Sequence, residues 1–156
     1  MFHFVRIPNQ AYIRANHVQR VRENEAKLMY TDAHNCDLLV PTFLTSSAIT
    51  LTNGMELFSN RSCQDLMSAV AEASEHAYTA PMAPVAISDR ITVDPAYIVA
   101  VLPCNPQICD CVGEHGYAIY PASRDPQCLI LLEDDTCLAV ETTPSELMDK
   151  LNAQQA

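Results

Sequence analysis

Residues 49–57 have the sequence ITLTNGMEL, and residues 62–70 have the sequence SCQDLMSAV. Both segments recur in the second half of the chain, where residues 130–138 are ILLEDDTCL and residues 143–151 are TPSELMDKL. Every equivalent pair of residues is 81 positions apart. A pattern that recurs at a fixed spacing is the sequence signature of a repeated folding unit. The sequence therefore predicts two tandem copies of one unit.

A third block extends the repeat toward the N-terminus. Residues 13–21 (IRANHVQRV) match residues 93–101 (VDPAYIVAV) at a spacing of 80, so one inserted residue further along accounts for the change to 81. A unit of about 80 residues is near the lower limit for an independently stable core, so we expect the two copies to pack together. The predicted boundaries are a first repeat over residues 1–76, a linker over 77–84 and a second, acidic repeat over 85–156.

A hairpin is predicted in each copy. In the first, apolar residues alternate on both sides of Asn53-Gly54, a pair that favours a type I′ turn. In the second, Asp134-Asp135 occupies the same place and lacks the glycine that adopts a positive φ without cost. Each copy thus contains antiparallel strands joined by short turns.

One helix is predicted to end each copy. Ser62 and Thr143 have the properties of N-caps, because each is followed three residues later by an acidic side chain. The spacing of apolar residues predicts one buried face per helix, formed by Leu66, Met67 and Val70 in the first and by Leu147, Met148 and Leu151 in the second. We therefore predict an α+β fold with two tandem copies of an antiparallel β-meander followed by one capped helix, related by a pseudo-twofold axis.

Composition limits the classes of function. The chain has 156 residues, of which 49% are hydrophobic, and a net charge of −10. Residues 1–80 carry six basic and eight acidic side chains, whereas residues 81–156 carry three and eleven. This charge argues against nucleic-acid binding, which needs a basic face. The sequence contains no apolar run of membrane-spanning length and does not begin like a signal peptide. We expect a cytoplasmic protein with reduced cysteines.

Four residues form the sharpest chemical pattern. Cys104, Cys109, Cys111 and His115 lie within twelve positions, and three thiolates with one imidazole can complete a tetrahedral zinc site. Pro106 and Gly113 predict a loop that wraps around the metal. The alternative interpretation is that these cysteines are reduced residues of the loop and core. Apart from zinc, the sequence predicts no cofactor.

The first copy resembles a known family. Residues 6–10 (RIPNQ), 15–18 (ANHV), 49–55 (ITLTNGM) and the helix over 62–70 resemble the small FlbD-type (SwrD-like) flagellar proteins. The resemblance implies a short β-meander, a hairpin and a capped C-terminal helix, together with a flagellar role and no catalytic residues. The chain departs from that family in its tandem arrangement, in its acidic second half and in two insertions, at about residues 22–47 and 102–128.

Together these patterns predict a binding protein that is not an enzyme. We expect an adaptor or inhibitor that acts through its sheet surface or its insertions on a protein partner of basic character, as a bacterial or phage accessory protein. The alternative is a protein that binds or sequesters a small ligand in a pocket between the repeats. Self-association into a homodimer is also expected. Nucleic acid and membranes are not expected partners.

Overall fold

The fold is that of a computed structural model, which describes residues 4–7, 11–23, 46–75, 84–87, 91–104, 106–121 and 124–155. Within these residues it combines three antiparallel or mixed sheets with three α-helices and two short 3-10 turns, so the predicted α+β class is confirmed. In chain order the elements are β1 (Phe4–Ile7), β2 (Ala11–Arg14), η1 (Ala15–His17), β3 (Val18–Glu23), β4 (Ser47–Leu51), β5 (Glu56–Ser59), α1 (Cys63–Glu75), β6 (Val85–Ala86), β7 (Thr92–Val93), η3 (Pro95–Tyr97), β8 (Ile98–Pro103), α2 (Pro106–Glu114), β9 (Ala118–Pro121), β10 (Cys128–Leu132), β11 (Thr136–Val140) and α3 (Pro144–Gln155).

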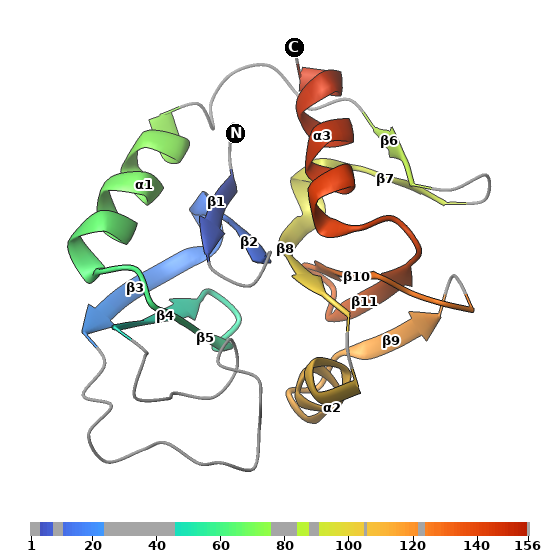
Figure 1. The fold of residues 1–156 in the computed structure, drawn as a ribbon, viewed down its shortest axis with the longest axis horizontal. Helices are drawn as coiled ribbons and strands as arrows, with labels where there is room; N and C mark the ends of the chain where they lie inside the picture. Colours follow the sequence, from blue (N-terminus) through green and yellow to red (C-terminus); the bar gives the residue numbers. More distant parts are fainter. Residues whose placement is uncertain are drawn as a thin grey trace.

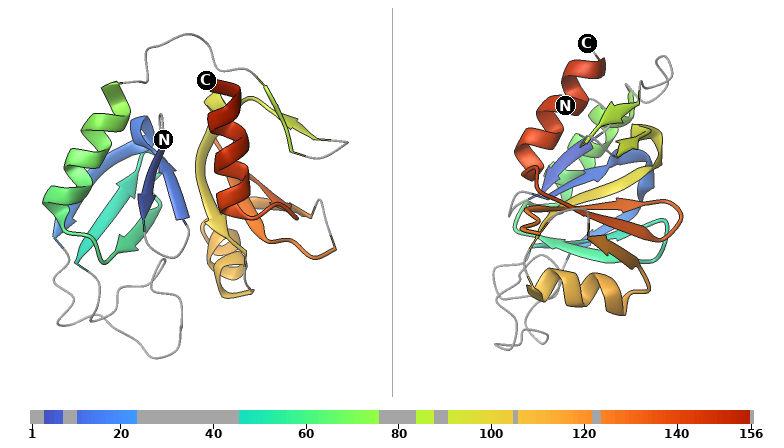
Figure 2. Two further views of the ribbon diagram at one scale, coloured as in Figure 1. Left: turned by 45° about the horizontal axis from the view of Figure 1, so that its top comes forward. Right: turned by 90° about the vertical axis from the view of Figure 1, so that its right-hand side faces the viewer.

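A six-stranded sheet joins the two halves of the chain. Its order is β1-β2-β8-β10-β11-β9, in which β2 of the first half pairs antiparallel with β8 of the second, and β9 runs parallel to β11. The smaller sheets are β3-β4-β5 and β6-β7. Figures 1 and 2 show the halves side by side, with β2 and β8 at their junction.

Two apolar cores lie on opposite faces of this sheet. Along β10, Leu129 and Leu131 belong to a first core cluster, which also contains Ile108 and Val112 of α2 and Leu66 of α1. The alternate residues Cys128 and Ile130 belong to a second cluster, which contains the apolar face of α3. Since successive side chains of a strand point to opposite faces, β10 separates the two cores.

The hairpins form where they were predicted, but the turn type differs. The N–H of Gly54 donates to the Leu51 carbonyl at 2.9 Å, and the N–H of Leu51 donates to the Met55 carbonyl at 2.8 Å. Gly54 has φ +89°, whereas Asn53 is not among the residues with positive φ. The type I′ prediction was therefore wrong, because the turn is type I followed by a left-handed glycine. Asp135, with φ 63°, occupies the left-handed position of the second hairpin.

The helices α1 and α3 begin at the predicted caps. The hydroxyl of Ser62 accepts from the Asp65 N–H at 3.1 Å, and that of Thr143 accepts from the Glu146 N–H at 3.2 Å. These bonds satisfy N–H groups that the first turn of a helix leaves without a partner.

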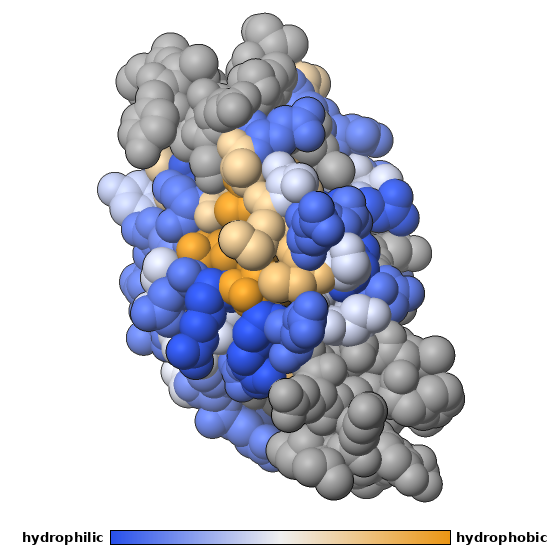
Figure 3. All heavy atoms as spheres, turned by 90° about the vertical axis from the view of Figure 1, so that its left-hand side faces the viewer, coloured by the Kyte–Doolittle hydropathy of each residue, from blue (hydrophilic) through white to orange (hydrophobic). Residues whose placement is uncertain are grey.

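The buried face predicted for α1 is only partly correct. Leu66 is buried, but Met67 is 57% exposed and Val70 is half-buried, whereas Leu147, Met148 and Leu151 of α3 are all buried. Figure 3 shows apolar side chains gathered in the middle of the side formed by α1 and β3, with hydrophilic residues around them. We call four large apolar side chains that these two elements leave partly or wholly exposed the α1 patch, namely Val18, Val21, Met67 and Val70.

The two predicted insertions differ in how much of them is described. Most of residues 22–47 and nearly all of the predicted linker, residues 77–84, lie outside the described residues. The second insertion contains α2 and β9. The metal-binding loop expected after Cys104 is thus corrected to a helix, which buries Ile108 and Val112, one turn apart, in the first core cluster.

The left-handed conformation of Gly54 in the first hairpin can be tested by substitution. A Cβ at Gly54 would meet no atom within 4 Å, so any cost of Gly54→Ala comes from the backbone alone. We expect Gly54→Ala to lower the free energy of unfolding by about 1 kcal/mol and Gly54→Asn, which tolerates a positive φ, to lower it less. Urea unfolding measures both values. Equal stability of the alanine variant and the unsubstituted protein would contradict the assigned turn.

Candidate functional site

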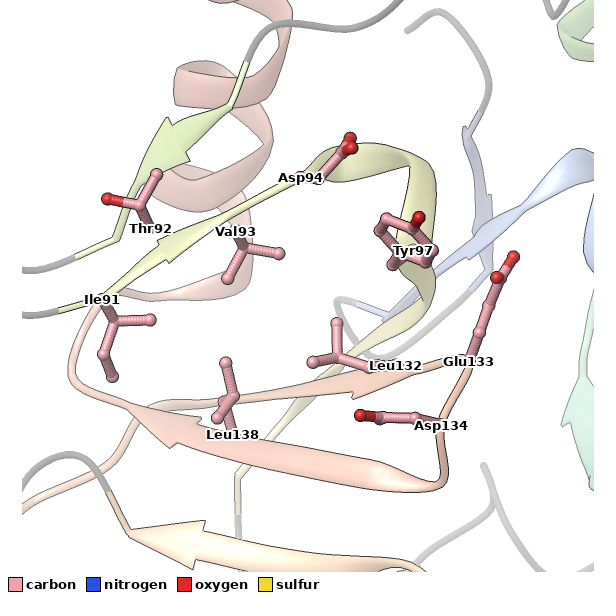
Figure 4. Close-up of a pocket in the computed structure, with 9 residues that line it drawn as sticks. All are labelled: Ile91, Thr92, Val93, Asp94, Tyr97, Leu132, Glu133, Asp134 and Leu138. Carbon is pink, nitrogen blue, oxygen red and sulfur yellow. The ribbon is translucent and has the colours of Figure 1, made fainter.

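A pocket of about 590 Å³ opens between β7, the turn η3 and the β10–β11 hairpin. Figure 4 shows that Val93, Leu132 and Leu138 point toward one another, whereas Thr92 and Asp94 point away from them, and we call this pocket the acidic pocket. Its lining consists of Ile91, Thr92, Val93, Asp94, Tyr97, Leu132, Glu133, Asp134 and Leu138. All nine residues belong to the second half of the chain, so this is not the pocket expected between the repeats.

The floor of the acidic pocket is apolar. Val93 is buried in the second core cluster, and Ile91, Leu132 and Leu138 pack against that cluster while remaining partly exposed. The ring of Tyr97 is 56% exposed above them. Apolar surface that a fold leaves open beside its core is suited to receive an apolar or long aliphatic group.

Three carboxylates stand around this floor, and local contacts hold each of them. A carboxylate oxygen of Asp94 accepts from the Ala96 N–H at 2.9 Å. One of Asp134 accepts from the Thr136 N–H at 3.1 Å and from the Thr136 hydroxyl. An oxygen of Glu133 lies 2.8 Å from Nε2 of His17.

One buried cation lies close to two of these carboxylates. Nη1 of Arg14 donates to the Pro95 carbonyl, and Nε donates to Asn16 at 2.9 Å. Burial lowers the pKa of Arg14, and the charges of Glu133 and Asp94 oppose that shift. Neither Lys nor Arg is among the lining residues. A single buried guanidinium against three carboxylates leaves the pocket with an excess of negative charge.

Of the predicted zinc ligands, the structure brings two together. The sulfur atoms of Cys104 and Cys109 are 3.6 Å apart, close to the separation of about 3.8 Å that two thiolates have around a tetrahedral zinc ion. His115 is exposed and stacks on Tyr117, with ring centroids 6.1 Å apart. The side chain of Cys111 lies outside the described residues. Within the described part of the chain, no group of three or more His, Cys, Asp or Glu side chains could hold a metal ion.

Two further cysteines are buried in strands. Cys128 and Cys137 have no exposed surface, and burial is the main cause that raises the pKa of both thiols, to about 12 for Cys137. Burial and the neighbouring thiol of Cys109 likewise raise the pKa of Cys104. Reactive thiols need a lowered pKa, so these three cysteines have the character of core residues.

Most of the pocket was not predicted from the sequence. The sequence predicted Asp134 in a hairpin turn, but it did not predict that this turn, β7 and Tyr97 line one pocket. The available signal was the number of apolar residues on the hairpin, which include Leu132 and Leu138.

Comparison with family models, with curated proteins and with solved structures finds no match for this chain. The resemblance to FlbD-type proteins therefore stays a prediction. None of the helices in the described ranges is long and apolar enough to cross a membrane.

The buried thiols should be slow to react. A thiol with a pKa near 12 carries roughly a thousandfold less thiolate at pH 8 than one at its ordinary value, so iodoacetamide should modify Cys137 and Cys128 only after unfolding. Mass spectrometry of protein labelled with and without urea measures this. Native labelling of Cys137 as fast as in urea would contradict its buried position.

The zinc prediction can be tested with the same protein. If Cys104 and Cys109 provide two of four ligands, protein purified without chelator should contain about one zinc per chain, and Cys109→Ser should lose it. Elemental analysis gives the metal content, and Cys63→Ser, which changes a thiol on α1, is the matched control. Metal-free protein would leave Cys104 and Cys109 as a reduced pair.

Proposed function

We propose that this protein is a non-catalytic binding protein, an adaptor or inhibitor, whose acidic pocket receives a cationic side chain of a basic protein partner. The observation that carries the proposal is the pairing of an apolar floor with three carboxylates, Asp94, Glu133 and Asp134. Long basic side chains place their methylene stems on apolar surface and their charge at its edge. The exposed ring of Tyr97 adds a face on which a guanidinium can stack.

The proposal includes the tandem duplication, which matching backbone details support. The strand pair β3–β4 shifts register between Val18 and Arg20, and β8–β10 shifts at the equivalent residues, between Leu131 and Leu132 opposite Ile98. Bulges are local features that related units keep. The turns η1 and η3 are 80 positions apart, and the left-handed residues Gly54 and Asp135 are 81 apart.

A small cationic ligand is the second candidate, and the volume of the pocket favours it. About 590 Å³ falls within the usual range of sites for small molecules. Native mass spectrometry of the purified protein separates the two candidates. A retained small cation would support ligand capture, and recovery of the bare chain would favour a protein partner.

The cationic specificity can be tested with a short peptide. We expect the peptide Ac-Leu-Arg-Leu-Arg-NH₂ to bind, and its analogue with citrulline in place of arginine to bind much more weakly, since citrulline has the same shape without the charge. NMR shift changes should centre on residues 91–97 and 132–138, and binding should weaken with salt. Equal affinity of the two peptides would overturn the proposal.

Protein variants supply the matching control. Glu133→Gln and Asp134→Asn each remove one charge, and the asparagine can still accept the Thr136 N–H. Each should weaken peptide binding by about two- to fivefold, the usual value of one partly exposed ion pair. Glu114→Gln removes an exposed charge from α2 and should leave binding unchanged.

A further inference from the structure

A contact inside the chain shows how two such halves fit together. Tyr12 and Ile13 of β2 pair with Val101 and Ala100 of β8. On one side of these strands, Tyr12 and Phe4 pack in the same core cluster as Met148 and Leu151 of α3. A strand edge of the first half and a helix face of the second half therefore cover each other.

In the described residues, the strands that correspond to β2 and β8 have no such contact with each other. The strand 80 positions after β2 is β7, and the strand 80 positions before β8 is β3. Among the strands that the structure describes, β7 pairs with β6 alone and β3 pairs with β4 alone. Within the described residues, each of these two strands thus keeps one edge without a pairing strand.

The free edge of β7 presents backbone groups beside the acidic pocket. The Ile87 N–H donates to the Ile91 carbonyl at 2.8 Å, which makes these residues a hydrogen-bonded pair. Such pairs alternate with non-bonded pairs along an antiparallel ladder. Thr92, opposite Ala86, therefore directs its N–H and carbonyl away from β6.

The free edge of β3 lies beside the α1 patch. Met67 is 57% exposed, whereas Met148, 81 positions later, is 2% exposed and belongs to the second core cluster, which also contains Phe4 and Tyr12. The apolar surface in Figure 3 therefore corresponds to a surface that the second half buries. On the other face of β3, Arg20 and Arg22 are exposed, at the positions that Ala100 and Leu102 occupy in β8.

We propose that a second copy of this chain docks its β3 edge and α1 patch onto the β7 edge and acidic pocket, and repeats between chains the contact that β2 makes with β8 within one. The register of that contact places Thr92 opposite Val21 and Val93 opposite Arg20 of the second copy. This inference rests on the proposed function of the acidic pocket, because it identifies a second copy of the chain as the basic partner.

Charge complementarity identifies the second copy as the occupant. In this register Arg20 and Arg22 of the incoming chain lie on the side of Val93 and Ile91, over the pocket floor. Their guanidinium groups then meet the carboxylates of Glu133 and Asp134. In the single chain Arg22 pairs with Glu56 at 3.0 Å, but both side chains are more than one-third exposed. Such an exposed pair is weak enough to be exchanged.

The two surfaces differ, so the association is head to tail. Figure 1 places β3 and β7 at opposite sides of the molecule. A contact between unlike surfaces leaves one of each free after every addition, and growth continues to a ring or a filament. Each added copy uses the same two surfaces.

Two single variants test this arrangement. Met67→Asp places a charge in the α1 patch and blocks one surface, while Thr92→Pro removes the outward N–H of β7 and blocks the other. Sedimentation velocity should show the unsubstituted protein growing beyond a dimer with concentration, and each variant alone remaining at 17.2 kDa. An equimolar mixture should form one-to-one dimers and nothing larger, because each variant keeps the surface that the other lacks.

Controls separate this outcome from misfolding and from failure of the pocket. Thr92→Val keeps the N–H and should assemble like the unsubstituted protein, and Arg20→Glu gives a second block of the β3 side. Circular dichroism should be unchanged in every variant. A protein that stays monomeric at all concentrations, or a mixture that forms no dimer, would overturn the inference. The Met67→Asp monomer still tests peptide binding, so the proposed function stands or falls separately.

Discussion

The pairing of β2 with β8 is the contact on which the rest of the structure depends. It joins strands from both halves into one six-stranded sheet and lets Ile13 and Ala100 share a core with Leu66 of α1. Polar contacts reinforce it, since Asn53 donates to the Tyr117 hydroxyl and Arg14 donates to the Pro95 carbonyl. A unit of half this length buries too little surface to be comfortably stable alone, so the shared sheet supplies what each half lacks.

The same pairing explains why equivalent residues have unequal surroundings. Leu51 and Leu57 are fully buried in the first core cluster, whereas Leu132 and Leu138, 81 positions later, line the acidic pocket. The first pair is covered because the second half lies against it. Among the described residues, nothing covers the second pair in the same way. The pocket therefore opens in the second half of the chain, at positions whose counterparts in the first half are covered.

The sequence predicted the features that local chemistry determines. Ser62 and Thr143 cap their helices with their own hydroxyl groups, and Gly54 takes the left-handed place in its turn. These choices depend on a few neighbouring residues. The exposure of Met67 could not be predicted from its helical position, which matches that of Met148, because only the tertiary packing of the second core cluster buries Met148. The helix α2 was missed because its cysteines, Pro106 and Gly113 suggested a metal loop, although Ile108 and Val112 have helical spacing.

Charged residues on an exposed strand edge usually protect against unwanted pairing, and Arg20 and Arg22 serve β3 in this way. A strand with an apolar or basic side would bury these guanidinium groups without a partner, at a large cost in free energy. An edge bordered by Glu133 and Asp134 gives them partners and an apolar floor for their stems. In the proposed assembly the two arginines therefore disfavour an apolar or basic strand and accept an acidic one. Within one chain the β2–β8 contact needs no such selection, because the partner strand is always present. Buried apolar residues, Ala100 and Leu102, therefore suffice at the positions that correspond to Arg20 and Arg22.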